Sequence, residues 1–314
     1  MKRFVPVVIT VVIVVAMTAY VVSQREMLEA LSKIHPVEIA LLILLSIAGL
    51  FAQAQQFRAA LTVSKIDIDI VEATGLTAVN TMANYYVPAR GGTVVRAGYM
   101  YAVHSMTVGA YAILTVVTVS IGLLVAVAAG LVTSLVLASR GDGEALRLVA
   151  PFLGVLALLA MAVVIAVVSA NLFSRSNRFA AAVQQLKTAV TLWRYEGSAA
   201  MKLLFWTILV LTAQISRLYL AFAAVGATVD VIEMVLIGSL VSMSFVISLT
   251  PGNLGVKEGV TAFAAALVGV PANVALLAAL VDRGAALVVT FCFGVGFFGP
   301  LMRRAKVART QTAE

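Results

Sequence analysis

The chain has 314 residues, of which 62% are hydrophobic and 11% are charged, and its formal net charge is +8. Soluble domains carry about 25% charged residues, more than twice the fraction in this chain. Many apolar stretches are also longer than the ~18 residues that indicate a membrane span. The composition leaves no room for a separate soluble domain and predicts an all-α, polytopic membrane protein with a single transmembrane domain over 1–314.

Cysteine and histidine content argues against metal and disulfide chemistry. One cysteine, Cys292, excludes an intramolecular disulfide and a Cys-x-x-Cys metal site. The two histidines, His35 and His104, are far apart and have no partners at the spacing of metal ligands. We therefore expect no metal site and no cofactor.

Several apolar segments are long enough to cross a bilayer. In chain order they are 4–22, 37–57, 105–138, 149–171, 203–223, 231–250 and 272–298. The first follows Lys2 and Arg3 and is expected to be a retained signal anchor. The basic stretch 174–202 is expected to lie on anionic lipid rather than nucleic acid, and with the basic C-terminal tail it is expected on the cytoplasmic side. Two cytoplasmic termini require an even number of crossings, so one more is needed.

The stretch "SLTPGNLGVKEGV", residues 248–260, supplies that crossing in this interpretation. Its proline and glycines interrupt an apolar run, so 251–270 is predicted to cross as a discontinuous helix, with an irregular turn and then a helix from about Val256. The earlier stretch 70–102 is also interrupted but needs no net crossing, which favours a re-entrant segment. The predicted fold has about eight crossings, including the broken helix, plus this re-entrant segment.

The two interrupted motifs, 84–98 and 248–260, share a pattern. In each, a glycine follows a proline by four residues and a cation comes next: Pro88, Gly92 and Arg96, then Pro251, Gly255 and Lys257. The residues expected to break the helices are Pro88, Gly92, Pro251, Gly252 and Gly255. One motif in each half suggests an internal repeat with halves 1–147 and 148–314, and paired interrupted segments point to a transporter's binding site.

Most charged residues lie in connections and tails, but a few lie within apolar segments or the interrupted motifs. These are Arg90, Arg96, Arg217, Lys257, Glu258, Asp282 and Arg283. An ionisable side chain inside a membrane is costly and is a functional hypothesis by default. Cations outnumber acids in this set, which favours an anionic ligand such as a lipid phosphate, with Asn84 and Asn253 as polar partners at the breaks.

A structural interpretation of the same residues stays open. Embedded acids and bases can be ion pairs that hold broken helices together, and Glu258 with Arg283 is a better pair than two neighbours, whose side chains point about 100° apart. Arg90 and Arg96 can snorkel to the interface. The two asparagines can serve freed backbone groups. An interfacial belt is the expected role of Tyr85, Tyr86, Tyr99 and Tyr101.

Both motifs resemble those of one known family, the lysylphosphatidylglycerol synthase transmembrane region, also called the flippase-like domain. Its C-terminal signature resembles 248–289 here, through Pro251, Gly252, Gly255, Val256, Glu258, Gly269-Val270-Pro271 and Arg283. Its earlier block resembles "NYYVPARGGTVVRA", through Asn84, Pro88, Arg90, Gly92 and Arg96. Order and separation also match, so the resemblance covers nearly the whole chain.

The chain departs from the family pattern at Thr93, Asn253 and Lys257, and it lacks a basic residue common within 111–129. These departures bear on headgroup specificity more than on fold. Residues 1–314 include no segment that resembles the soluble aminoacyl-transferase domain of full-length members, so the resemblance does not imply lipid aminoacylation.

The resemblance and the embedded cations together imply an integral membrane lipid translocase for an anionic phospholipid or lipid-linked headgroup, acting without catalysis. We expect it in the cell membrane, with membrane lipids as partners and either a second copy or a lipid-modifying enzyme as protein partner. A first alternative is a non-catalytic scaffold for a lipid-modifying or glycosyltransferase pathway. A second, ranked lower, is an intramembrane transferase using the D-x-D-like pair Asp67 and Asp69.

Overall fold

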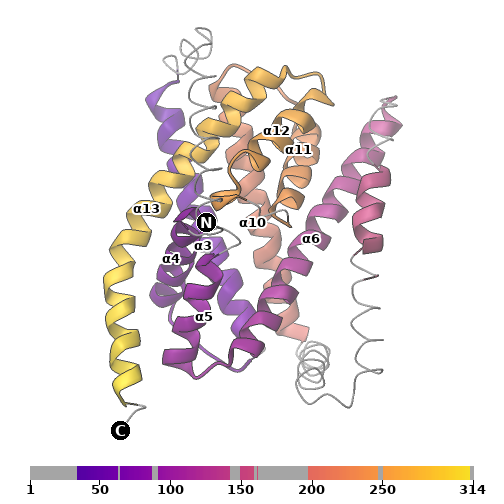
Figure 1. Ribbon diagram of the computed structural model, residues 1–314. Coiled ribbons are helices and arrows are strands. Elements are labelled where there is room, and N and C mark those ends of the chain that lie inside the picture. The colour runs from indigo at the N-terminus through magenta and orange to yellow at the C-terminus, as the bar shows by residue number, and fades with distance from the viewer. Residues whose placement is uncertain are drawn as a thin grey trace, which may run out of the picture.

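The structure is a computed structural model (Figure 1), and it describes residues 34–62, 64–86, 91–141, 149–158, 161, 197–246 and 250–311. Every regular element in these ranges is helical, so the predicted all-α class is confirmed. Several predicted features lie outside the described residues: the segment 4–22, most of 149–171, nearly all of 174–202, Pro88 and Arg90.

Four helices in the described part are long and apolar enough to cross a membrane. They are α3 (Pro36–Thr62), α6 (Val108–Ser139), α10 (Gly197–Ala224) and α13 (Ala272–Gln311). At 1.5 Å per residue each exceeds the ~30 Å hydrocarbon core. Large apolar side chains point outward along them, for example Leu44 and Val295. Such a surface suits helices surrounded by lipid, and the chain is a multi-pass membrane protein.

A first hairpin is built from two shorter helices, α4 (Ile70–Tyr86) and α5 (Gly91–His104). At its open end His104 meets Glu72, with 2.7 Å between Nε2 and Oε1. At its tip the Asn84 side-chain oxygen accepts a hydrogen bond of 2.9 Å from the backbone N–H of Gly92. The chain therefore enters and returns at the same end, which is the re-entrant arrangement predicted for 70–102.

A second hairpin stands where two crossings were predicted. It contains α11 (Val231–Met243), the 3₁₀ turns η1 (Ser244–Val246) and η2 (Pro251–Asn253), and α12 (Val256–Ala266). α11 has 13 residues and α12 has 11, so they are about 20 and 17 Å long and neither spans a bilayer. The helix start at Val256 is as predicted, but 251–270 does not cross the bundle. Charge counting could not detect this, because a hairpin that returns to its own side gives the same parity as two crossings.

The two hairpins enter from opposite ends of the molecule and their tips meet (Figure 1). A Cβ placed on Gly252, in η2, would lie only 2.3 Å from a ring atom of Tyr85 at the end of α4. Within the described residues, the order of a long helix, a hairpin and a long helix occurs twice, from α3 to α6 and from α10 to α13. The internal repeat stays a prediction.

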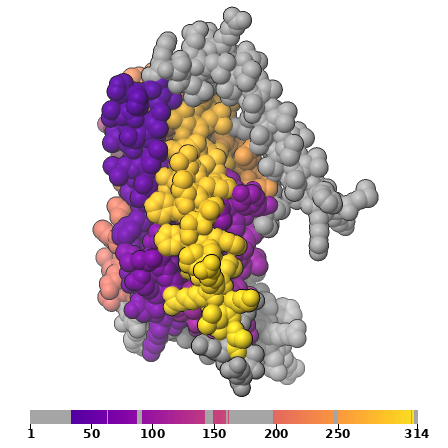
Figure 2. Space-filling model, turned by 90° about the vertical axis from the view of Figure 1, so that its left-hand side faces the viewer, coloured from indigo at the N-terminus to yellow at the C-terminus, as the bar shows by residue number. Residues whose placement is uncertain are grey.

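Two apolar cores lie on either side of the meeting tips. One packs the first hairpin against α3 and the C-terminal part of α13, around Leu61, Met100 and Leu301. The other packs the second hairpin against α10 and the N-terminal part of α13, around Phe222, Ile237 and Ala278. Figure 2 shows α13 running along this face, beside α3 and the first hairpin. The cores hold the hairpins in place and leave the region between their tips to polar side chains.

Candidate functional site

The tip of the second hairpin is an irregular turn that leaves backbone groups unused by helices. Gly252 and Asn253 have φ of 61° and 57°, the left-handed region that glycine and asparagine tolerate best. Pro251 cannot continue the preceding hydrogen-bond pattern, because it has no backbone N–H. The turn therefore presents free carbonyl oxygens at membrane depth, where each needs a partner.

Arg283 of α13 is that partner. Its two terminal nitrogens donate hydrogen bonds of 3.0 and 3.3 Å to the carbonyls of Gly252 and Asn253. Its Nε forms an ion pair with Glu258, which is 1% exposed. The other oxygen of Glu258 accepts a hydrogen bond of 2.8 Å from the Gly255 backbone N–H, which closes the first turn of α12. The cross-pairing expected for Glu258 and Arg283 is thus present, and it locks the tip to α13.

A second charge cluster joins three elements next to the first. Asp282 of α13 is 1% exposed and lies 2.5 Å from Nε of Arg217 in α10 and 2.5 Å from Nζ of Lys257 in α12. Arg217 donates to both carboxylate oxygens, and Lys257 donates to Oδ2. One buried acid therefore serves two bases, and the cluster has a net positive charge.

Arg96 of the first hairpin carries a further cation into the same region. Its Nε donates a hydrogen bond of 2.6 Å to the hydroxyl of Tyr111, and its guanidinium carbon lies 4.2 Å from the centre of the Phe57 ring. Within the described ranges no carboxylate oxygen lies within ion-pair distance of this guanidinium. Among the described residues, the neighbours of this charge are the aromatic side chains of Phe57 and Tyr111.

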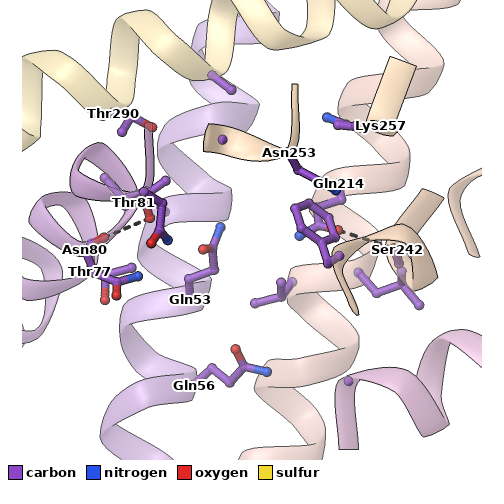
Figure 3. A pocket seen from close by; sticks show the side chains of 18 of the residues that line it. Gln53, Gln56, Thr77, Asn80, Thr81, Gln214, Ser242, Asn253, Lys257 and Thr290 are labelled. Atoms are coloured by element: carbon purple, nitrogen blue, oxygen red, sulfur yellow. Dashed lines mark hydrogen bonds between the residues drawn. The ribbon is translucent and has the colours of Figure 1, made fainter. Parts of the chain in front are cut away.

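These groups line one cavity of about 430 Å³ at the meeting of the two hairpin tips. Walls come from α3, α4, α5, α6, α10, α11, α12, α13 and the second tip, and many lining side chains are polar. Figure 3 shows amides and hydroxyls around the space, with Asn253 and Lys257 approaching from the second hairpin. A polar cavity of this size inside a bundle of apolar helices is the feature expected of a ligand site in a membrane.

The predicted site residues lie in different places relative to the cavity. The structure brings seven of them to the cavity wall: Asn84, Arg96, Arg217, Asn253, Lys257, Asp282 and Arg283. Glu258 lies behind the wall, on Arg283. Arg90 falls outside the described residues. Of the predicted breaks, Gly252 lines the cavity, Pro251 and Gly255 shape the second tip, and Gly92 packs against α4.

Sequence reasoning missed the uncharged half of the cavity. Its members on α3 and α4 are Gln53, Gln56, Thr77, Asn80 and Thr81. Their three- and four-residue spacing, continued by Asn84, forms a polar stripe along otherwise apolar helices, and side chains three or four positions apart share a helix face. A search for polar stripes, in addition to charges, could have found them.

A second polar cluster was also missed, and it lies at the open end of the first hairpin. Glu72 accepts hydrogen bonds of 2.9 Å from the Tyr99 hydroxyl and 2.9 Å from Arg304 of α13, besides its contact with His104. Tyr99 is 2% exposed, so the interfacial role expected of it is wrong, whereas Tyr101 is exposed at 61%. The cluster ties the base of the hairpin to the C-terminal part of α13.

Replacing Tyr99 with phenylalanine is expected to lower the free energy of unfolding by about 1.5–3 kcal/mol, because a buried carboxylate loses one charge-assisted hydrogen bond. Tyr101→Phe, on the same helix but exposed, is the matched control and should change nothing measurable. Thermal or denaturant unfolding in detergent gives the comparison. Equal effects of the two variants would show that the Glu72 cluster does not stabilise the hairpin.

Replacing Gly92 with alanine is expected to destabilise the first hairpin by about 1–3 kcal/mol. Its Cβ would lie 1.9 Å from the backbone carbonyl oxygen of Asn80, an atom that cannot move without shifting α4. Gly98→Ala is the control in the same helix, since its Cβ would meet nothing within 4 Å and alanine favours the helix. The unfolding midpoints of the two variants test this, and a Gly92→Ala midpoint at or above the wild-type value contradicts it.

The two aspartates of the transferase interpretation do not line the cavity between the hairpin tips. Asp67 has a 93% exposed side chain and lies 3.6 Å from Arg58, and Asp69 accepts a hydrogen bond from the Val71 backbone at the start of α4. Across the described residues, no group of three or more His, Cys, Asp and Glu side chains could hold a metal ion. The two aspartates thus act as a surface charge and a helix cap.

Fold and cavity together define a multi-pass membrane protein with two opposed re-entrant hairpins around a buried, cation-rich polar site. Comparison with known protein families assigns it further. The model of the lysylphosphatidylglycerol synthase TM region matches residues 4–294, and the chain belongs to this family. A search of curated proteins and a search of solved structures each found no match. The family match concerns a membrane region related to lipid, and it includes both interrupted motifs.

Proposed function

We propose that this protein moves an anionic lipid across the membrane, with the headgroup passing through the cavity between the hairpin tips. The observation that carries the proposal is the placement of that cavity. It lies where the two short hairpins meet, so its polar walls are at the middle of the bundle and not at either surface. The family to which the chain belongs is consistent with a lipid as the substrate.

The charge balance of the site supports an anionic ligand. Four cations, Arg96, Arg217, Lys257 and Arg283, stand against two acids, Asp282 and Glu258. Both acids are buried and engaged in ion pairs, which leaves an excess of two positive charges among the described charged groups of the site. A phosphate would supply the missing negative charge, and Arg96, whose charge is not neutralised by a described carboxylate, is the natural group to bind it.

The arrangement of elements supports passage from either side. Both hairpins contribute to the cavity wall, and broken helices around a central site are typical of transporters that give access from one side and then the other. We place the protein in the cell membrane with the basic C-terminal part of α13 in the cytoplasm, by the positive-inside rule. The first hairpin then enters from the cytoplasmic side, since Glu72 at its base contacts Arg304.

The proposal is tested with purified protein in liposomes that contain a trace of tail-labelled fluorescent phosphatidylglycerol. Loss of fluorescence after adding dithionite outside reports how much labelled lipid reaches the outer leaflet. Wild-type protein should move the lipid. Arg96→Gln should slow the movement about tenfold or more, because it removes a charge-assisted contact worth about 1.5–3 kcal/mol.

Arg303→Gln is the matched control, because Arg303 is exposed on α13 and does not line the cavity. It removes the same charge and should leave the rate unchanged. The proposal is wrong if the labelled lipid moves no faster than in empty liposomes while a verified scramblase is active in parallel. That result would favour the alternative of a non-catalytic scaffold. Equal rates of lipid movement in wild-type and Arg96→Gln protein would show that Arg96 does not bind the headgroup during transport.

A further inference from the structure

The cavity wall contains a carboxylate that is not free for a ligand. Among the described residues that line the cavity, Asp282 carries the single carboxylate. Arg217 donates to both of its oxygens, at 2.5 and 3.4 Å, and Lys257 donates to one of them at 2.5 Å. A headgroup ammonium would therefore find no free acid to pair with, and it would share the cavity with several cations. Burial of an unpaired charge is strongly unfavourable.

The rest of the polar wall is uncharged and rich in groups that both donate and accept hydrogen bonds. Amide and hydroxyl side chains reach the space from α3, α4 and α10: Gln53, Gln56, Thr77, Asn80, Thr81 and Gln214 (Figure 3). Gln56 and Gln214 each contact a neighbouring hydroxyl, at 2.9 and 3.4 Å. Thr81 donates a hydrogen bond of 2.9 Å to the backbone carbonyl of Thr77, and the Gln53 amide lines the space.

Some of these groups are buried without a partner in the described part of the chain. Thr77 is 2% exposed and Asn253 is 4% exposed, and neither the Thr77 hydroxyl nor the Asn253 side-chain oxygen has a hydrogen-bond partner there. The side-chain oxygen of Asn80 is likewise buried and has no hydrogen-bond partner among the described residues. Buried polar atoms are almost always satisfied in folded proteins. These three atoms have almost no accessible surface, so they lie in the polar wall beside the cavity and a ligand reaches them only if a side chain turns.

We propose that the cavity selects a phosphate ester whose remaining headgroup is an uncharged polyol, such as glycerol, inositol or a sugar, over zwitterionic and aminoacylated headgroups. The cations hold the phosphate. The polyol hydroxyls then pair with the amide and hydroxyl side chains of the wall, since a hydroxyl both donates and accepts. This specificity rests on the proposed function in one respect: it takes the cavity between the hairpin tips to be the lipid-binding site.

A binding experiment tests the selection independently of transport. The purified protein in neutral detergent is mixed with equal amounts of phosphatidylglycerol, phosphatidylinositol, phosphatidic acid, phosphatidylethanolamine and lysylphosphatidylglycerol, and retained lipid is measured by native mass spectrometry. We expect at least tenfold more phosphatidylglycerol and phosphatidylinositol than phosphatidylethanolamine or lysylphosphatidylglycerol. Phosphatidic acid, with the phosphate but no polyol, should lie between. Equal retention of all five lipids, or a preference for either headgroup with an ammonium, overturns the proposal.

Paired variants locate the selectivity. Gln53→Met with Thr77→Val removes two polar groups with little change of volume, and it should lower binding of the polyol lipids about tenfold while leaving phosphatidic acid unchanged. Gln55→Met is the control, because Gln55 is on the same helix, does not line the cavity and contacts Arg58. A double variant that keeps its preference for polyol lipids overturns the assignment of these groups.

The outcomes separate this proposal from the translocase proposal. Selective binding without movement between leaflets removes the proposed function and supports the selectivity. Movement of all anionic lipids at one rate, with no selective binding, does the reverse. Soluble glycerol 3-phosphate and inositol 1-phosphate serve as competitors. Displacement of the lipid by these esters at equal concentration would assign the site to a soluble phosphate ester and overturn the lipid source, whereas no displacement supports it.

Discussion

Replacing Asp282 with asparagine is expected to lower the free energy of unfolding by about 3–5 kcal/mol. The substitution keeps the shape of the side chain and removes the negative charge that Arg217 and Lys257 share. The two cations would then lie close together, mostly buried and without a counter-charge. Breaking a buried ion pair by removing one partner is costly for this reason, even where the intact pair adds little stability. Denaturant unfolding in neutral detergent measures the loss.

Asp67→Asn is the control for this substitution. Asp67 makes the same kind of contact with a cation, at 3.6 Å from Arg58, but its side chain is 93% exposed. Exposed ion pairs contribute about 0–1 kcal/mol, so this variant should be close to wild type. Adding Arg217→Gln to Asp282→Asn should recover part of the loss, because one unpaired cation is removed. Equal stability of the Asp282 and Asp67 variants would show that the cluster is not a structural centre.

Replacing Arg283 with methionine is expected to have a similar effect, about 3–5 kcal/mol, for a different reason. Methionine fills much of the same volume but leaves Glu258 buried and unpaired. It also removes the donors to the carbonyls of Gly252 and Asn253, which have left-handed backbone and no helical partners. The irregular turn at the tip of the second hairpin should therefore become unstable, and unfolding should begin there.

A double-variant cycle separates the two contributions. Glu258→Gln with Arg283→Met removes the stranded charge, so the double variant should lose clearly less than the sum of the single variants. Arg303→Met, exposed on the same helix, is the control and should be neutral. Hydrogen exchange should increase in α12 and η2 of Arg283→Met before it does in the first hairpin. An increase spread evenly over both hairpins contradicts the local role given to Arg283.

The charges of the site could be found from the sequence because charge inside an apolar segment is rare and expensive. Arg217 stands out within its span in this way, and so do Asp282 and Arg283. The pairing of Glu258 with Arg283 could also be anticipated, since adjacent helical side chains diverge. The pairing of Asp282 with Lys257 and Arg217 could not, because it depends on how α10, α12 and α13 pack.

The uncharged wall was harder to see for a related physical reason. Gln53 and Thr77 cost little in a membrane helix, where a glutamine or threonine can also pair with its own backbone or another helix. Such residues are therefore common and carry weak signal one at a time. Their meaning comes from position, because α3 and α4 place them on one cavity. The Glu72 cluster was missed likewise, since its partners Tyr99 and Arg304 are far apart in sequence.

The sequence by itself determined the class of protein, the long helices and the two breaks. Apolar length decides what can cross a bilayer, and proline and glycine decide where a helix must stop. Only the tertiary structure decided that 231–266 turns back instead of crossing twice, and that the two tips meet around one cavity. Hydropathy and charge parity are the same for a hairpin and for two crossings. The difference lies in the packing of α11 and α12 against their neighbours, which no local pattern records.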